Sequence, residues 1–163
     1  MSSSRPLPKT RKTAPQAVDR RGFENGSETK ISDNPSLFEP KGLAMDFQEQ
    51  ALQHTQIRET LGAAISEGKP IDPAAYRSDR QCPTGCWLHG EAARRWAGNH
   101  AFLGLLEAHR AFHARAGEVA ELARRGDHVE AQRALRNGTP FAESLADLNA
   151  AFRRMRAAAT VAA

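Results

Sequence analysis

The chain has 163 residues, a formal net charge of +4 and a hydrophobic content of 40%, which is low enough to predict that part of it lies outside the folded core. A net positive charge of this size does not by itself predict a nucleic-acid partner, and we expect none. The two cysteines are closely spaced, so we expect no disulfide scaffold. No run approaches the roughly 18 apolar residues of a membrane span. We therefore expect no leader peptide and a cytoplasmic protein.

Residues 1–42 are predicted to form a disordered basic tail. The first 21 residues carry six cations against the single acid Asp19 and show no periodic apolar pattern. Such tails are usually solvated, although this one offers charge to an acidic partner, RNA or a membrane surface. We expect a helical bundle over residues 43–158 and a flexible C-terminus over residues 159–163.

From Leu43 the apolar pattern becomes helical. Five residues share one face at steps of 7, 3, 4 and 4, namely Phe47, His54, Ile57, Leu61 and Ile65. Gly68 and Pro70 are predicted to end this helix, and the connector that follows is expected to include a short helical turn. His54 stands on this apolar stripe. It is either a metal ligand or a core histidine that is hydrogen-bonded.

A second helix is predicted to begin at Cys82 and Pro83 and to run through Trp87 to about Trp96. Proline suits the first helical position because its missing N–H would have no intrahelical partner. Unpaired N–H groups and the helix dipole stabilise a thiolate at a helix N-terminus, and a thiolate is the form that binds zinc. The alternative for Cys82 is a small buried hydrophobe.

The third helix is predicted to begin near Asn99 and to end at the turn Gly126–Asp127. Its seam has alternating steps of 4 and 3 and comprises Phe102, Leu106, His109, His113, Ala116 and Ala120, the packing pattern of a four-helix bundle. His109 and His113 lie on one face, so both rings can reach one ion. Alternatively, they are partly buried polar residues with ordinary hydrogen bonds.

The last helical segment runs from Ala131 through Phe141 to Met155, and residues 137–140 either kink it or split it. No stretch alternates with period two, so strands are not expected. The predicted fold is all-α: a four-helix bundle with a short extra helix.

His54, Cys82, His109 and His113 together form a closed tetrahedral zinc set. Four protein ligands leave no open position for water or substrate, so we do not expect an enzyme. A di-iron site would need Glu-x-x-His pairs, which the histidine-bearing helices lack. The other three histidines, His89, His100 and His128, are predicted to lie at the surface.

These residues and their neighbours resemble the chemoreceptor zinc-binding domain of bacterial signalling proteins. The resemblance covers about residues 45–157 and is carried by Cys82, Gly85 and Trp87, by His54, and by the His-x-x-x-His at His109–His113. The last helix also fits, at Ala131 and Ser144.

The resemblance implies a homodimeric four-helix bundle in which three histidines and one cysteine hold zinc. Such domains are attached to chemoreceptors or regulate diguanylate cyclases, and they sense zinc or oxidants such as hypochlorous acid through the zinc-bound cysteine. This sequence departs from the pattern at Ile57 and Arg58, where a tryptophan is common, and at Cys86. No output motif is recognised, so we expect action on a partner in trans.

Cys82 is expected to be the movable ligand because it stands at a helix end. Cys86, one helical turn on, is a candidate redox partner that would convert an oxidised Cys82 to a disulfide; alternatively, it has no role. Two other hypotheses for the function of the chain stay open: a metal-independent helical interaction module and a zinc-buffering protein.

Overall fold

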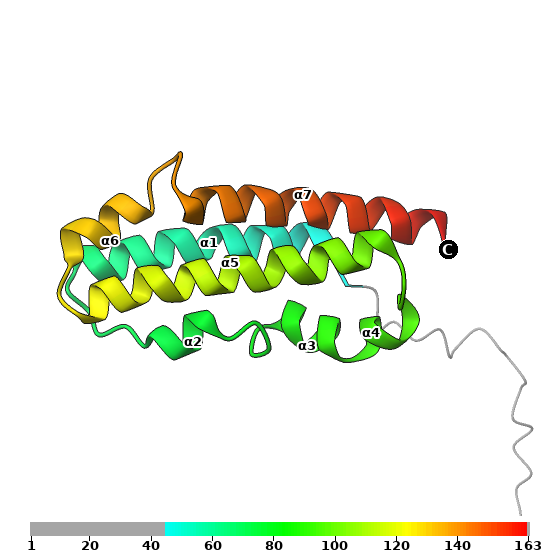
Figure 1. Ribbon diagram of the computed structural model, residues 1–163, viewed down its shortest axis with the longest axis horizontal. Coiled ribbons are helices and arrows are strands. Elements are labelled where there is room, and N and C mark those ends of the chain that lie inside the picture. The colour runs from blue at the N-terminus through cyan, green and yellow to red at the C-terminus, as the bar shows by residue number, and fades with distance from the viewer. Residues whose placement is uncertain (1–44, 163) are drawn as a thin grey trace, which may run out of the picture. The chain divides into compact units, whose positions relative to one another are not determined.

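The structure, a computed structural model, describes residues 45–162, so the predicted basic tail lies outside the described residues. These residues form seven helices and no strand, which confirms the all-α prediction (Figure 1). The helices are α1 (Phe47–Ser66), α2 (Pro73–Arg77), α3 (Pro83–His89), α4 (Glu91–Arg95), α5 (His100–Arg124), α6 (His128–Ala134) and α7 (Pro140–Val161). Within the described residues, every helix is too short or too polar to span a membrane.

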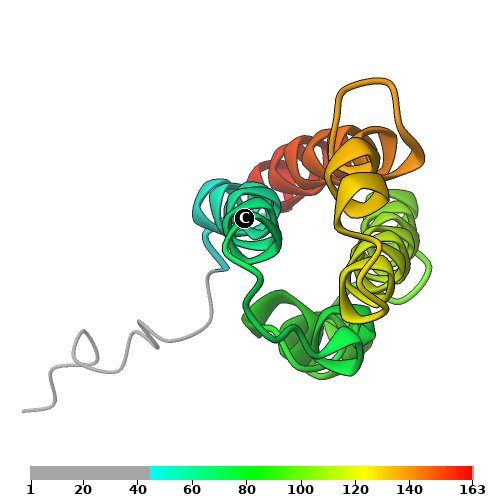
Figure 2. The same ribbon diagram turned by 90° about the vertical axis from the view of Figure 1, so that its left-hand side faces the viewer.

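Three long helices, α1, α5 and α7, run side by side, and the fourth side of the bundle is a row of the short helices α2, α3 and α4. The end-on view shows the four sides around one axis (Figure 2). The most extensive packing joins α5 to α7 and to α2. The predicted bundle is therefore present, with its fourth side built from short helices.

Local capping explains where the long helices begin. Asp46 accepts hydrogen bonds from the N–H groups of Gln48 and Glu49 at the start of α1, and Asn99 caps α5 in the same way. Gly68, with φ of 63°, follows the end of α1. Thr139 caps α7 with Pro140 at its first position, so the segment around residues 137–140 splits the last helix rather than kinking it.

The predicted single helix from Cys82 to Trp96 is wrong, because Gly90 divides it into α3 and α4. Gly90 has φ of −104° and ψ of −104°, outside the helical range. A Cβ atom at this position would lie 2.7 Å from the carbonyl oxygen of Cys86. The break therefore depends on a close backbone approach that a glycine allows.

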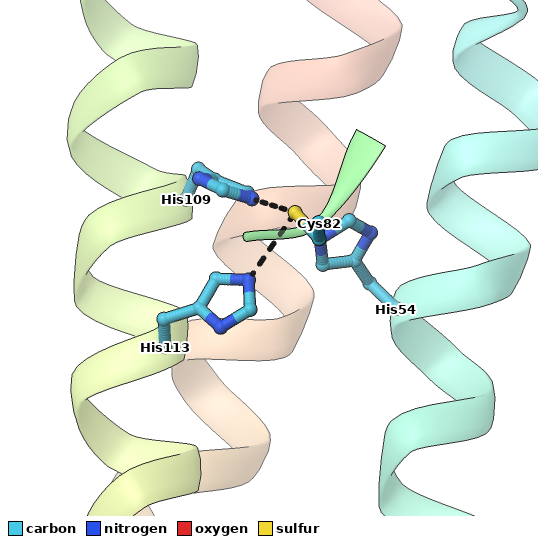
Figure 3. A group of neighbouring side chains, drawn as sticks. All are labelled: His54, Cys82, His109 and His113. Carbon is cyan, nitrogen blue, oxygen red and sulfur yellow. Dashed lines mark hydrogen bonds between the residues drawn. The ribbon is translucent and has the colours of Figure 1, made fainter. Parts of the chain in front are cut away.

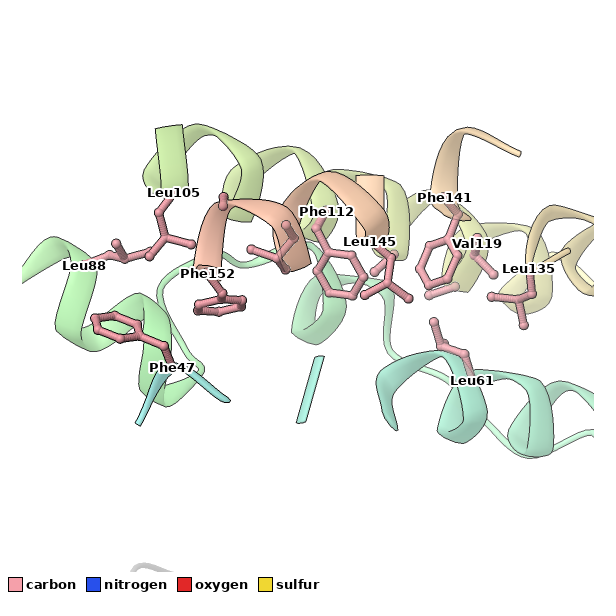
Figure 4. Close-up of a cluster of buried hydrophobic side chains, with 14 of the residues drawn as sticks. Phe47, Leu61, Leu88, Leu105, Phe112, Val119, Leu135, Phe141, Leu145 and Phe152 are labelled. Atoms are coloured by element: carbon pink, nitrogen blue, oxygen red, sulfur yellow. The ribbon is translucent and has the colours of Figure 1, made fainter. Parts of the chain in front are cut away.

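Aromatic and aliphatic side chains from α1, α3, α5 and α7 fill the interior (Figure 4). The buried seam of α5 includes Leu105, whereas the predicted Leu106 is half-buried. Among the described residues, six polar side chains are also buried, namely Gln50, His54, Thr84, His109, His113 and Ser144. Buried polar groups need partners, and five of these six belong to the site or its surroundings.

Helix α7 continues to Val161, beyond residue 158, at which we expected the bundle to end.

Candidate metal centre

The structure brings His54, Cys82, His109 and His113 together in the interior of the bundle (Figure 3). The Sγ atom of Cys82 lies 3.1 Å from Nε2 of His109, 3.7 Å from Nε2 of His113 and 3.8 Å from Nε2 of His54. All four candidate ligand atoms lie within 4.8 Å of one another. The donors come from three elements, since α1 carries His54, α5 carries both other histidines and Cys82 precedes α3.

This donor set fits zinc. In a tetrahedral zinc site, the bonds are about 2.0–2.1 Å to nitrogen and about 2.3 Å to sulfur. A nitrogen ligand and the sulfur ligand then lie about 3.6 Å apart. The three Sγ–Nε2 distances of 3.1–3.8 Å bracket that separation. Imidazole and thiolate are the ligands that zinc takes in closed, structural sites.

Cys82 is held at the N-cap of α3, with its side chain turned into the bundle. Its Sγ accepts a hydrogen bond of 3.3 Å from the N–H of Gly85. A Cβ atom on Gly85 would lie 2.0 Å from the carbonyl oxygen of Asp79. The glycine therefore allows the loop before Cys82 to fold against the first turn of α3.

Backbone carbonyls orient two of the three imidazoles. Nδ1 of His54 donates a 2.7 Å hydrogen bond to the carbonyl of Gln50, and Nδ1 of His113 donates a 2.8 Å bond to the carbonyl of Tyr76. A carbonyl only accepts, so each Nδ1 carries the hydrogen and each Nε2 presents its lone pair to the cluster. Nδ1 of His109 is buried and has no hydrogen-bond partner among the described residues.

Burial keeps the histidines neutral. It lowers the pKa of His54 to about 4 and that of His109 to about 3, and it also lowers the pKa of His113. The neutral imidazole is the form that coordinates a metal. The metal-free cluster is therefore ready to accept an ion at neutral pH without losing protons from its histidines.

The thiol of Cys82 behaves differently from the sequence-based expectation. Burial raises its pKa and outweighs the opposing hydrogen bonds from the N–H groups of Gly85 and Thr84. The helix N-terminus alone therefore does not make a thiolate here, and a bound cation would have to displace the proton.

A polar contact beside the ligands was not predicted. Thr84 Oγ1 donates a 2.8 Å hydrogen bond to Oε1 of Gln50, and both residues are buried. Gln50 also supplies the carbonyl that orients His54. The signal was available in the sequence, because Gln50 lies between Phe47 and His54 at helical spacing on the same stripe.

His89 is partly buried, which corrects the prediction of a surface position, whereas His100 and His128 are exposed. Nε2 of His89 lies 2.9 Å from Oδ2 of Asp79, and the side chains are only 17% and 19% exposed. Asp79 belongs to the loop that leads to Cys82, so this contact ties the loop to the end of α3.

The cluster is reachable from outside. A cavity of about 220 Å³ is lined by Cys82 and His113, together with Ile57, Tyr76 and other residues of the connector. Cys86 does not join the cluster: it is exposed, and its S–H donates to the carbonyl of Arg80 at 3.4 Å. The two cysteines thus face different surroundings one turn apart.

The family model described as the chemoreceptor zinc-binding domain matches residues 54–120, which confirms the predicted resemblance. The matched segment begins at His54 and contains all four residues of the cluster. No curated protein and no solved structure shows significant similarity to this chain.

Proposed function

We propose that this chain, which carries a chemoreceptor zinc-binding domain, is a regulatory protein whose zinc ligands are His54, Cys82, His109 and His113. The observation that carries the proposal is the convergence of three Nε2 atoms on one thiol sulfur. When bound, zinc supplies a cross-link between α1, α5 and the start of α3. Its binding free energy then contributes to the folding free energy of the bundle.

The set of four protein donors supports a regulatory rather than a catalytic role, because it leaves no position for a substrate. We expect a cytoplasmic homodimer that acts in trans on a bacterial signalling protein, either a chemoreceptor or a diguanylate cyclase. The description of the matched family supports a partner from chemotaxis. Loss of zinc would loosen α3 and the loop before it, and the partner would respond to that change.

Hypochlorous acid is the second candidate signal, and it is favoured by the cavity that opens on Cys82. With its proton displaced by the bound cation, the Cys82 thiolate would take oxygen from the acid to give a sulfenic acid and chloride. The exposed Cys86 thiol would then displace water and form a disulfide. Because Cys82 faces the histidines and Cys86 faces away, the disulfide requires Cys82 to leave the cluster.

The function is tested by measuring binding of the full chain to chemoreceptors and diguanylate cyclases from the same cell. The assay is run with one equivalent of zinc, with a chelator, and with Cys82→Ser protein. We expect the affinity for one partner to differ at least tenfold between the zinc-loaded and chelated states. Equal affinity in all states would identify a metal-independent interaction module, and tight zinc binding without any partner would identify a zinc buffer.

The oxidant branch is tested by adding one equivalent of hypochlorous acid to the zinc-loaded chain. We expect zinc release to a chromophoric chelator and a Cys82–Cys86 disulfide in peptide mass spectra. Cys86→Ser protein should release zinc without the disulfide. Retention of zinc without a Cys82–Cys86 disulfide would rule out oxidant sensing.

A further inference from the structure

A second concave site lies where the start of α1, the helices α3 and α4, and the end of α7 meet. It is a groove of about 440 Å³, within the size range of small-molecule sites. Its apolar lining includes Met45, Phe47, Trp87 and Trp96. None of the four cluster residues of the metal centre lines it.

Aromatic rings form much of this lining. The rings of Phe47 and Trp87 meet edge to face with centroids 5.5 Å apart. The guanidinium of Arg95 lies 5.6 Å from the centre of the Trp96 ring, which holds a cation beside an apolar surface. The groove thus combines broad aromatic surface with a positive charge at its wall.

The charge of the lining is positive. Arg95 and Arg156 contribute two guanidinium groups, and Glu91 contributes the one carboxylate. Within residues 45–162, none of these three side chains forms an ion pair. A neighbouring hollow shares Phe47 and Arg156 and adds Arg153, which extends the positive charge along α7.

We propose that this groove binds a small apolar molecule that carries one carboxylate. The aromatic lining favours an alkyl or aromatic body. Arg95 and Arg156 favour a carboxylate, because guanidinium groups pair with it through two parallel hydrogen bonds. A cationic ligand of the same shape would face two like charges against the single carboxylate of Glu91.

The chain supplies its own reporter for the test. Trp87 and Trp96 are the only tryptophans in the sequence, and both line the groove. Decanoate does not fluoresce, so when it is titrated into the zinc-loaded full chain below its micellar concentration, any change in tryptophan emission comes from these two groove residues. Decyltrimethylammonium, with the same chain and opposite charge, is the matched probe.

We expect a saturable change in tryptophan fluorescence with decanoate, and binding at least tenfold weaker with decyltrimethylammonium. The double variant Arg95→Gln and Arg156→Gln should weaken decanoate binding at least fivefold. Arg154→Gln, an exposed position on α7 that does not line the groove, should leave it unchanged. Full zinc content in each variant verifies folding.

Equal binding of the two probes would show simple partition onto an apolar surface and would overturn the proposal. So would a decanoate affinity unchanged by the double variant, or the absence of saturation.

Discussion

Thr84 donates a buried hydrogen bond of 2.8 Å to the side chain of Gln50, and this contact joins the first turn of α3 to α1. Each residue also adjoins a ligand. Thr84 follows Cys82 by two positions, and the carbonyl of Gln50 accepts the Nδ1 hydrogen of His54. The hydrogen bond therefore fixes the distance between two candidate zinc ligands that come from different helices.

Thr84→Val keeps the shape of the side chain and removes this hydrogen bond. It leaves the buried oxygen of Gln50 without its donor, which costs roughly 1–3 kcal/mol. We expect a loss of this size in the free energy of unfolding, measured by urea denaturation of the zinc-loaded protein, and a weaker zinc affinity. Thr84→Ser keeps the donor and should keep the zinc affinity, although the loss of its fully buried methyl group costs roughly 1 kcal/mol of stability. Equal zinc affinity of the valine and serine variants would show that the contact is unimportant.

Gly85→Ala should disturb the loop that carries Cys82, because the added Cβ would overlap the carbonyl oxygen of Asp79 at 2.0 Å. We expect zinc affinity, measured by competition with a chelator, to fall at least tenfold. Gly104→Ala is the matched control, since no atom lies within 4 Å of its Cβ position. Alanine replaces glycine there within α5, which should stabilise the helix by roughly 0.5–1 kcal/mol. Similar zinc affinity in both variants would contradict the close approach at Gly85.

Removal of zinc should lower the melting temperature of the full chain. Zinc that binds only the folded state stabilises it by about 4 kcal/mol when free zinc exceeds the dissociation constant a thousandfold. Differential scanning calorimetry with and without a chelator measures the effect. His100→Gln, at an exposed position outside the cluster, should show the same dependence on zinc, whereas His109→Gln should lose it. A melting temperature insensitive to the chelator would favour the metal-independent module.

The metal-free protein should lose stability as the pH falls from 7.5 to 5. Burial lowers the pKa of His54 to about 4 and of His109 to about 3, whereas unfolded histidines titrate near 6.5. The unfolded state therefore binds more protons in this range, and the free energy of unfolding falls by about 2 kcal/mol for each of these residues. Urea denaturation in chelator at each pH measures the decline, and His54→Gln should reduce its slope. A free energy of unfolding that does not change with pH would mean that the imidazole rings of His54 and His109 are solvated.

Local chemistry explains how much of the fold was predictable. The long helices follow from apolar spacing and from the caps at Asp46, Asn99 and Thr139, all of which are properties of nearby residues. The break at Gly90 was missed because it depends on an approach to the carbonyl of Cys86. That distance exists only once the chain has folded.

The same distinction applies to the site. The four candidate ligands were predictable because histidines on apolar helical faces, and a cysteine directly before a helix-opening proline, are chemically conspicuous. The carbonyl of Tyr76 that orients His113 was not, since every residue has a carbonyl. The raised pKa of Cys82 does not follow from its place at a helix N-terminus, because it results from burial, which depends on the folded chain.

X-ray absorption at the zinc edge, with metal analysis, measures the ligands of the proposed zinc site. We predict one zinc per chain with three nitrogen ligands at about 2.0–2.1 Å and one sulfur at about 2.3 Å, and loss of the sulfur in Cys82→Ser. A first shell without sulfur in the unaltered chain, or a chain that takes up no zinc after refolding with the metal, would contradict this prediction.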